Sequence, residues 1–503
     1  MKKSIAFLLA CVLLLSFASC ASEPAADTTT TAAAEDTGDS GVDSKGFELD
    51  TLGNSLNYND ETVKILHWSD VERHEFGMAE EDAYATIVDE AIYTRNISTE
   101  SRLHVKLEWE GTKGNNSNVN SFLNYVTSQQ AGGNTYDLIA SYSRTMGLLA
   151  TRGLLEDLNA VDDSHLNWSK PWWPQTMLDT CTIDDSLYFC TGDISTNLLH
   201  FMYAVWYNMD LAENLHIDNP VPMVDNGTWT LANMIRLTKD LYEDNNSNGK
   251  RDEADSYGMC SEVYHLDSFW TGAGLKLVEA DEEKILKISD DFSSAKAVDF
   301  VDTLGNWATS DVCFIKSGVL GSVDYFEPFI GGRALFCPNR VYIADREHYS
   351  HLNEVKWRYG VLPLPMYNED QDRYITVIGN PVTLWGMMVG QGYDLMERNS
   401  AVLECLASYA FRLTTPALFE VNMKYKYTSG AENDGVRMFD LIRSGVTLDL
   451  GRIFSTYLQV MSEKPSEAAA KGESWASKCK SLADSLGKNL ERGVVAPILE
   501  LKG

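Results

Sequence analysis

The chain has 503 residues, of which 44% are hydrophobic, and it carries a formal net charge of -32 at pH 7. This length exceeds the roughly 250–300 residues at which a single hydrophobic core stops growing, so we expect two lobes. The acidic surface repels phosphates and anionic lipid headgroups, which argues against nucleic acid as a partner.

The N-terminus has the pattern of an export signal. Two lysines precede an apolar run from Ile5 to Phe17, and small residues lead to Cys20. The apolar run is shorter than the about 20 residues that a transmembrane helix needs. We therefore expect residues 1–19 to be a signal peptide.

The residues around Cys20 predict a membrane anchor. Phe-Ala-Ser-Cys at 17–20 resembles a bacterial lipobox, which implies that Cys20 is lipidated, although Phe17 departs from the usual leucine. Ordinary cleavage near Ala21 is the alternative. Residues 20–58 are rich in Ala, Thr, Asp, Ser and Gly, a composition that cannot offset the entropy of ordering, so we expect a disordered tether.

Strands and helices alternate at the start of the folded part. This alternation predicts a parallel sheet, in which ligands lie beyond the carboxyl ends of the strands. The loops at those ends are residues 68–73 and 141–144. The expected elements are strands at 61–68, 103–109 and 136–140, and helices at about 85–98 and 119–130.

An apolar and aromatic run, LLHFMYAVWYNMDL at Leu198–Leu211, predicts a buried strand that enters a helix. We interpret this run as a crossing between two lobes, a place where ligand pockets preferentially form. After the run, GTWT at 227–230 opens a predicted helix that extends to about Glu243, with Thr228 as its N-cap.

The most specific local motif is DNNSNGKRDEAD at 244–255. Its spacing matches a calcium loop, with oxygen ligands at positions 1, 3, 5, 9 and 12 and a turning glycine at position 6. Two ligand positions carry amides and the last carries Asp in place of Glu, so a solvated Asn-rich turn is the alternative. The predicted ligands of a structural Ca²⁺ are Asp244, Asn246, Asn248, the carbonyl of Lys250, Asp252 and Asp255.

The cysteines show no CxxC motif and no metal-type spacing. Without Cys11 and Cys20, seven of the nine remain, scattered from Cys181 to Cys479. An odd number in an exported chain argues against a disulfide framework. Pairing of Cys181 with Cys190 and isolated thiols both stay open.

Short motifs follow one another along the chain in a recognisable order. They are YDLI at 136–139, GLLEDLN at 153–159, VWYNMDL at 205–211, GTWT at 227–230, GGRALF at 331–336, YGVLPLP at 359–365 and DLIRSGVTLDLG at 440–451. In this order and spacing they resemble the extracellular solute-binding lipoproteins of bacterial carbohydrate ABC importers. The resemblance covers most of residues 60–495.

The resemblance implies a two-lobe α/β fold of the periplasmic-binding-protein type II, with a ligand cleft between the lobes and extra C-terminal helices. By analogy, lobe 1 comprises residues 59–200 and about 376–425, and lobe 2 comprises about 201–375 and 426–503. The implied protein is a monomer, lipid-anchored at the extracellular face of the cell membrane. It would close on a carbohydrate, expected to be an oligosaccharide, and deliver it to the transmembrane subunits of a permease.

A sugar site needs flat aromatic faces for C–H surfaces and planar polar groups for hydroxyls. Such side chains at strand ends and in irregular loops are candidates for the site, although packing of the indoles and structural salt bridges of the arginines are the alternatives. The candidates are Trp68, Asp70, Arg73, Tyr142, Arg144, Trp172, Trp173, Asp267, Trp270, Tyr325, Asn339 and Arg340.

Catalytic motifs are missing from the sequence. There is no GxSxG, HExxH or P-loop, and the nine histidines form no metal-type cluster. Neighbouring acids such as Asp184 and Asp185 leave a surface glycoside hydrolase as an alternative, which would need two carboxyl groups facing one another across a site. A non-catalytic adhesive or sensory lipoprotein is the other alternative. We expect a binding protein and not an enzyme.

Overall fold

The computed structural model describes residues 41–133, 135–316, 324–345, 352, 355–418 and 434–502. The predicted signal peptide, Cys20 and residues 20–40 of the predicted tether lie outside these residues. Within the described part of the chain, no helix is both long enough and apolar enough to cross a membrane.

The first sheet has four strands in the order β12-β3-β1-β2. β1 pairs in parallel with β2 and β3, as the alternation of elements predicts, and β12 pairs antiparallel with β3. Every residue of β3 and β12 is buried, because helices cover both faces of the sheet. The strands are β1 (Glu61–Trp68), β2 (Val105–Thr112), β3 (Leu138–Tyr142) and β12 (Thr383–Met387).

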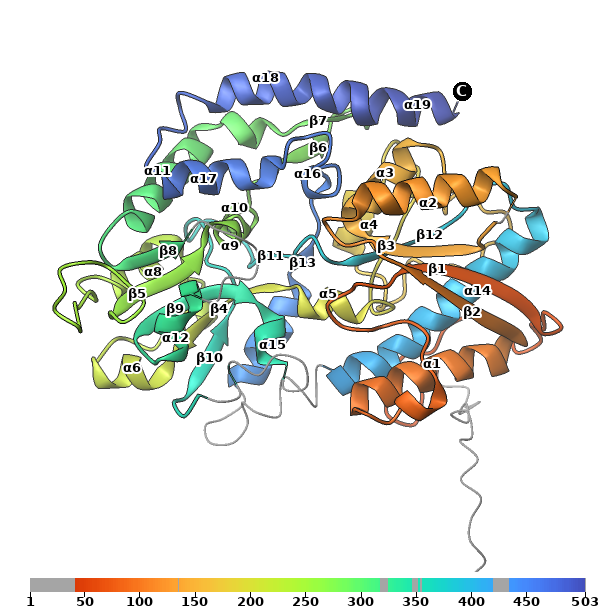
Figure 1. Ribbon diagram of the computed structural model, residues 1–503, viewed down its shortest axis with the longest axis horizontal. Helices are drawn as coiled ribbons and strands as arrows, with labels where there is room; N and C mark the ends of the chain where they lie inside the picture. Colours follow the sequence, from red (N-terminus) through yellow and green to blue (C-terminus); the bar gives the residue numbers. More distant parts are fainter. Residues whose placement is uncertain are drawn as a thin grey trace, which may run out of the picture. The chain divides into compact units, whose positions relative to one another are not determined.

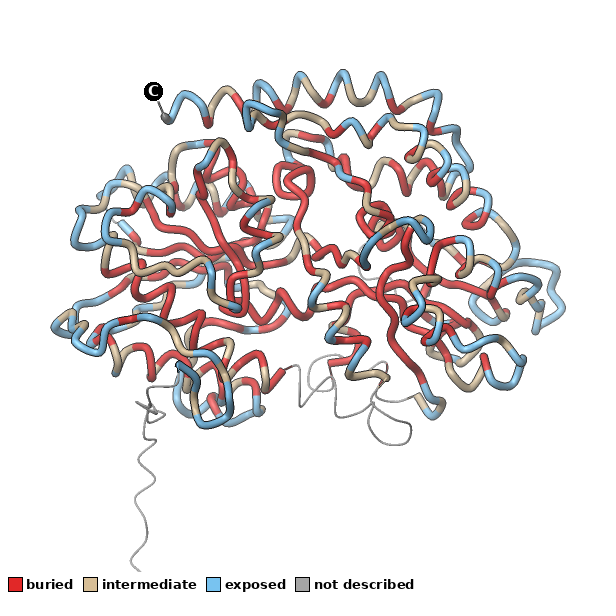
Figure 2. Tube along the Cα trace, turned by 180° about the vertical axis from the view of Figure 1, so that it is seen from behind, coloured by how far each residue is buried: buried red, intermediate tan, exposed pale blue. Residues whose placement is uncertain are grey.

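Four helices cover the first sheet (Figure 1). α1 (Ile87–Leu103) and α14 (Tyr393–Tyr409) pack together on one face, whereas α2 (Val119–Ala131) and α3 (Ser143–Thr151) pack together on the other. α1 begins after Thr86, whose hydroxyl accepts a hydrogen bond from the N–H of Asp89. The buried core follows the sheets and the inward faces of these helices (Figure 2).

The second sheet has five strands in the order β10-β4-β9-β5-β8. β5 is parallel to β8 and β9, and β4 is antiparallel to β9 and β10. The strands are β4 (Tyr203–Asn208), β5 (Tyr257–Glu262), β8 (Cys313–Lys316), β9 (Ala334–Arg340) and β10 (Tyr359–Leu362). The strands of the two sheets fall inside the segments predicted for lobes 1 and 2, and the lobe boundaries themselves stay a prediction.

Two chain segments connect the sheets side by side. One contains α5 (Thr196–His200) and leads into β4, as predicted, and Asn208 caps the following α6 (Met209–Asn214). The other includes residues 376–382: Met202 forms a bridge with Ile378, and the Gly379 N–H donates to the Phe201 carbonyl at 2.8 Å.

The C-terminal chain packs against elements of both sheets, as the implied extra helices require. α16 (Leu450–Ile453) and α19 (Ala496–Lys502) contact α3, whereas α17 (Lys464–Ala470) packs on α11 (Ala295–Ala308). Further elements are α4 (Gln175–Cys181), α7 (Val221–Asp225), α8 (Leu231–Leu237), α9 (Val263–Leu266), α10 (Ser268–Gly272), α12 (Glu327–Ile330), α15 (Asp434–Ser444), α18 (Cys479–Leu490), β6 (Val278–Ala280), β7 (Leu286–Ile288), β11 (Thr376–Val377) and β13 (Val446–Thr447).

The predicted tether ends earlier than residue 58. Phe47 packs edge-on against Phe411 with ring centroids 5.6 Å apart, Leu52 is buried, and the Asp50 carboxylate pairs with Arg102 at 2.7 Å. The prediction of disorder is therefore wrong for this stretch, because apolar side chains and ion pairs of Glu48 and Asp50 hold it against the first lobe.

The helix predicted at 228–243 is shorter than expected. α8 begins after Thr230, whose hydroxyl accepts from the N–H of Asn233 at 3.3 Å, and ends at Leu237. Thr228 is not the N-cap, because its hydroxyl donates to the Met223 carbonyl.

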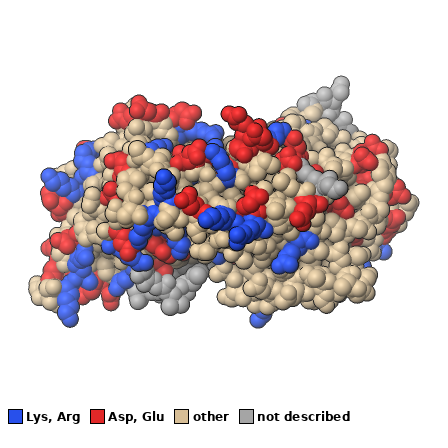
Figure 3. Space-filling model, turned by 90° about the horizontal axis from the view of Figure 1, so that it is seen from above, with Lys and Arg blue, Asp and Glu red and all other residues tan. Residues whose placement is uncertain are grey.

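The seven cysteines of the described residues are all buried, and no disulfide forms among them, so Cys181 and Cys190 are both thiols. Burial raises the pKa of Cys181 to about 12, and it also raises the pKa of Cys190. Acidic residues outnumber basic ones in the sequence, yet Figure 3 shows both signs interspersed on one face of the molecule.

Candidate functional site

A cavity of about 900 Å³ is lined by the ends of strands from both sheets. Trp68 and Tyr142 end β1 and β3, whereas Glu262 and Arg340 end β5 and β9. These are carboxyl ends of strands, where open α/β sheets place their ligands. Both loops predicted from this rule contribute to the lining.

Two buried aromatic side chains, Trp68 and Tyr142, form part of the cavity wall on the side of the first sheet. The Trp68 indole N–H donates to the Thr383 hydroxyl at 2.9 Å, and its ring lies 5.6 Å from that of Tyr142. Trp68 has no exposed surface and Tyr142 is only 3% exposed. Both rings therefore pack behind the surface of the cavity and have little accessible area on which a ligand could stack.

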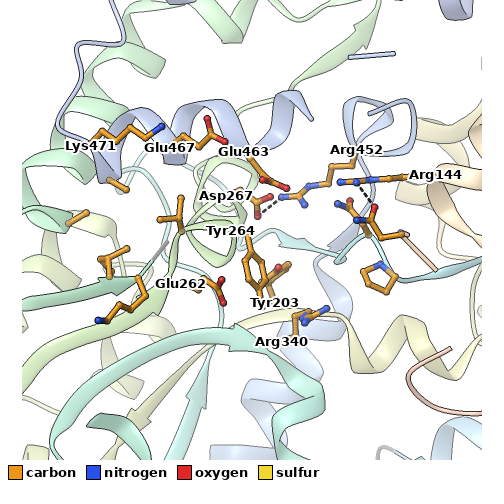
Figure 4. Close-up of a pocket in the computed structure, with 18 of the residues that line it drawn as sticks. Arg144, Tyr203, Glu262, Tyr264, Asp267, Arg340, Arg452, Glu463, Glu467 and Lys471 are labelled. Atoms are coloured by element: carbon orange, nitrogen blue, oxygen red, sulfur yellow. Dashed lines mark hydrogen bonds and ion pairs between the residues drawn. The ribbon is translucent and has the colours of Figure 1, made fainter. Parts of the chain in front are cut away.

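Arg144 brings a positive charge to the same wall. It lies in the first turn of α3 and is half-buried, and its Nη1 donates to the Asn116 side-chain oxygen at 2.8 Å (Figure 4). No ion pair involves Arg144 within the described chain.

The wall from the second sheet presents charged groups. Arg340 is 8% exposed, and its guanidinium carbon lies 4.9 Å from the Phe201 ring centroid and 4.8 Å from that of Tyr342. Glu262 is 2% exposed, and both of its carboxylate oxygens are buried. Tyr264 is half-buried, so it is the aromatic ring of the lining that can offer a face to a ligand.

Burial changes the protonation of the cavity acids. Removal from water raises the pKa of Glu262 from its usual 4.5 to about 7, against the opposing influence of the Tyr264 hydroxyl and of Arg340. The pKa of Glu463 is also raised, mainly by burial. Near neutral pH, Glu262 is thus partly protonated, whereas an arginine always keeps its charge.

Asp267, a predicted site residue, lines the cavity but is already paired. The Arg452 guanidinium lies 2.8 Å from its carboxylate, and both side chains are 3% exposed (Figure 4). Burial still raises the pKa of Asp267, while Arg452 opposes that rise. The pair joins α16 to the loop after α9 and helps to shape the cavity.

Two predicted residues of the first loop have structural partners. Asp70 accepts hydrogen bonds from the backbone N–H groups of Gly114 and Asn115 at 2.7 and 2.9 Å, and so braces the loop after β2. Arg73 is 2% exposed and pairs with Asp345 at 2.7 Å. Neither side chain lines the cavity.

Three predicted indoles are core residues. Trp172 is fully buried and packs against Phe411, and Trp173 is 1% exposed with its N–H donating to Glu404 at 2.8 Å. Trp270 is 2% exposed and packs against aromatic rings of the second lobe. Their assignment to ligand binding is wrong, because the segments that carry them fold inward.

Tyr325 and Asn339 form a layer behind the second wall. The Asn339 amide donates to the Tyr325 hydroxyl at 3.0 Å, and that hydroxyl lies 3.1 Å from His265 Nε2. Both residues are more than nine-tenths buried and do not line the cavity. They position the end of β9, which carries Arg340.

Several lining residues were not predicted from the sequence. Glu262 and Tyr264 end β5 or follow it, so the strand-end rule could have found them had this strand been assigned. The lining residues after residue 450 do not lie at strand ends, so the strand-end rule could not predict them. The unpredicted polar and aromatic members include Glu72, Asn115, Asn116, Tyr203, Glu262, Tyr264, Asn380, Arg452, Glu463, Glu467 and Lys471.

The fold has two sheets, and a cavity is lined by residues from both of them. Residues 84–309 match the family described as bacterial extracellular solute-binding protein. The match covers less than half of the chain; it confirms the predicted resemblance to extracellular solute-binding proteins and agrees with the prediction of a binding protein. A comparison with curated proteins gives no match.

Three solved structures of similar fold have descriptions that name a bound sugar. The galacto-N-biose and lacto-N-biose I-binding protein of Bifidobacterium longum is 12% identical with a TM-score of 0.57, and the match covers 87% of this chain and 98% of that one. An ABC substrate-binding protein of Listeria monocytogenes, solved with cycloalternan, is 14% identical (TM-score 0.52, coverage 86% and 99%). The maltose-binding periplasmic protein of the same species is 14% identical with a TM-score of 0.52, and the match covers 86% of this chain and 98% of that one. The likeness confirms the predicted two-lobe fold.

Proposed function

We propose that this protein is the substrate-binding component of an ABC importer and that it holds an oligosaccharide in the cavity between its sheets. The observation that carries the proposal is a cavity whose lining comes from both sheets. A ligand that contacts both walls gains contacts in the closed state that the open state lacks, and this difference in affinity is what closure requires.

The size and chemistry of the cavity support a saccharide. Its volume of about 900 Å³ lies near the top of the range of about 300–1,000 Å³ for ligand sites, so a chain of several sugars fits better than one ring. Tyr264 can stack on a sugar face, and Glu262 and Arg340 can bind hydroxyls. The three structural relatives named above bind sugars according to their descriptions, which supports the same ligand class.

Thermal unfolding in the presence of a glycan panel tests the proposal. A saccharide at 100 times its Kd should stabilise the protein by about 2.7 kcal/mol. Small-angle scattering should show contraction as this saccharide is added, and product analysis should recover it intact. Cleaved glycan would favour the hydrolase, and unchanged dimensions with bound ligand would favour a rigid adhesin.

We further propose that Cys20 carries a lipid which holds the protein, as a monomer, at the extracellular face of the membrane beside its permease. The lipobox-like residues support the anchor, and the family description supports the extracellular location. Labelling with a radioactive fatty acid should mark the full chain, whereas Cys20→Ser should abolish the label and release the protein into the medium.

The loop at 244–255 is our proposed structural Ca²⁺ site. The Asp244 carboxylate accepts from the N–H groups of Asn248 and Gly249, and Gly249 has the positive φ of 70° that the turn needs. Asp255 is fully buried and accepts from the N–H of Asp252 at 3.2 Å. These carboxylates point into the loop, which suits a hard cation. Within the described residues, no group of three or more His, Cys, Asp or Glu side chains converges as a metal centre, so the amides and the Lys250 carbonyl would have to complete the set.

The amides of this loop would have to turn to bind the ion. The Asn246 and Asn248 side-chain nitrogens donate to the Asp252 carboxylate at 3.1 and 2.7 Å. Rotation of both amides would present their oxygens to Ca²⁺ instead. EDTA should lower the melting temperature, calcium should restore it, and Asp244→Ala should remove the response. Identical melting curves with EDTA and with calcium would exclude the site and leave sugar binding untouched.

A further inference from the structure

One cation of the cavity lacks an anionic partner although it is buried. Arg340 is 8% exposed, yet no ion pair within the described chain includes it, and its Nε has no hydrogen-bond partner. Figure 4 shows its guanidinium below Tyr203 with no dashed line reaching it. Other buried arginines have acceptors: Arg452 and Arg398 pair with carboxylates at 2.8 and 2.7 Å, and Arg95 donates to the Ile194 and Glu75 carbonyls at 3.2 and 2.9 Å.

The position of the Arg340 guanidinium is fixed before any ligand arrives. The rings of Phe201 and Tyr342 lie 4.9 and 4.8 Å from its central carbon, and a Cβ at Gly379 would lie 3.1 Å from its Cδ. Contacts with aromatic faces offset part of the cost of burying the charge, but they leave the N–H donors facing the cavity without acceptors. Such a preorganised guanidinium loses little entropy when it binds an anion.

The acids of the cavity do not neutralise this charge. Glu262 and Glu72 influence Arg340 from a distance, and neither comes within ion-pair range of it. A buried carboxyl can relieve its burial by taking up a proton, and the pKa of Glu262 is raised to about 7. A buried guanidinium cannot become neutral in this way, because it stays protonated in proteins. The missing partner is therefore an anion that comes from outside.

We propose that the cavity binds a saccharide bearing an anionic group, a carboxylate or a sulfate ester, and that Arg340 binds this group through paired hydrogen bonds. The inference rests on the proposed carbohydrate function and narrows its substrate class. Arg144 faces the same cavity from α3 without a carboxylate partner, so the first lobe can add a second cation on closure. Planar anions match the fork of N–H donors of an arginine.

The net charge of -32 does not oppose this assignment at short range. Exposed charges are screened over about 10 Å at 0.1 M salt, whereas a guanidinium inside a cavity is screened much less. The acidic surface slows the approach of an anion, and the buried cation determines how tightly it is held. We therefore expect the association rate to rise with salt.

Calorimetric titration of the full chain tests the proposal. The probes are a panel of uronate oligosaccharides, each paired with its carboxyl-reduced neutral counterpart, and sulfated forms of the same neutral chains. At least one anionic form should bind about tenfold or more tightly than its neutral counterpart, because a charged hydrogen-bonded pair is formed only with the former. Whether the uronate or the sulfated form binds more tightly shows whether the anionic group of the ligand is a carboxylate or a sulfate ester.

Substitution of Arg340 assigns the effect to this residue. Arg340→Gln should lower the affinity for the anionic saccharide by about 10- to 100-fold, to a value close to that for the neutral saccharide. Arg340→Lys should keep part of the preference for the anionic form. Arg358→Gln is the control: Arg358 pairs with Asp210 and Glu213 on the surface and does not line the cavity, so this variant should keep the preference.

Each outcome decides a separate point. Equal binding of anionic and neutral chains would overturn the anion assignment and leave carbohydrate binding standing. A preference that survives in Arg340→Gln would overturn the role of Arg340. Binding of none of the saccharides would refute both this inference and the proposed function. Circular dichroism of each variant establishes that a lost preference is not lost folding.

Discussion

Two buried arginines, Arg73 beside the first sheet and Arg340 at the end of the second, show how partners separate a structural charge from a ligand-binding one. Arg73 is 2% exposed and its Nη1 lies 2.7 Å from Asp345, which also contacts His200 at 3.0 Å. Arg340 is 8% exposed and contacts aromatic faces but no carboxylate. Burial alone does not distinguish the two residues, whereas the presence of a carboxylate does.

The Arg73 cluster connects the two lobes. Arg73 follows β1 of the first sheet, Asp345 follows β9 of the second, and His200 ends α5 in the connecting segment. Burial lowers the pKa of His200 below its usual 6.5, although Asp345 opposes the shift. The neutral histidine can thus complete the hydrogen bonding of Asp345 while Arg73 supplies the charge.

The largest expected effect comes from breaking the paired arginine. Arg73→Met should lower the free energy of unfolding by about 3–5 kcal/mol, because it leaves the buried Asp345 carboxylate without its cation. Arg340→Met should change the same quantity by far less, or even raise it, since no buried carboxylate loses a partner. Urea unfolding of both variants without ligand measures the difference. Equal destabilisation by the two substitutions would mean that Arg340 is structural after all.

The same contrast extends to aromatic residues with a smaller effect. Tyr264→Ala should weaken saccharide binding by about 1–3 kcal/mol, as expected for the loss of a stacking surface, with little change in stability. Trp173→Ala serves as the matched contrast, because its buried indole bonds to Glu404. It should destabilise the fold by about 3–5 kcal/mol and change affinity only through folding. Ligand titration and urea unfolding of the two variants measure both effects. A Trp173→Ala variant that kept its stability but lost affinity for the saccharide would contradict the prediction.

The smallest expected effect concerns pH and Glu262. Its pKa is about 7 in the folded protein against a usual 4.5, so the folded state holds the proton more tightly than the unfolded chain does. The contribution of Glu262 to stability must then fall as pH rises from about 4.5 to 7. Ionisation would also place a negative charge on the cavity wall, and so weaken the binding of an anionic ligand by at most about tenfold per pH unit.

Glu262→Gln isolates this effect. The variant should lose less stability than the natural protein between pH 5 and 8, and its affinity for an anionic saccharide should depend less on pH. Unfolding and titration at several pH values provide both measurements. Parallel pH profiles for the two proteins would show that Glu262 does not carry the titration.

Local patterns predicted the first sheet well. The strand expected at 61–68 is β1 itself, and the helix expected at 119–130 is α2 to within one residue, because alternation and periodicity are properties of neighbouring residues. The packing of residues 41–58 could not be predicted in this way. It depends on contacts such as Phe47 with Phe411, which are far apart in the sequence.

The site was predictable where a strand end could be located. Trp68, Tyr142 and Arg340 follow this rule, since the residue after a strand lies at the ligand edge of a sheet. Trp172 and Trp173 could not be judged, because the exposure of an indole depends on which helix covers it. Arg452 was missed because its segment lies far along the chain from the strands whose ends line the cavity; it lines the cavity itself and pairs with Asp267.

The buried thiols have a consequence for how the protein matures. A thiol reacts with oxidants as its thiolate, and burial raises the pKa of Cys181 to about 12, so almost no thiolate exists at neutral pH. Because the described residues form no disulfide, folding of this domain outside the cell would then need neither a thiol oxidase nor a disulfide isomerase. Refolding yields with and without dithiothreitol should be the same, and the purified domain should resist inactivation by air.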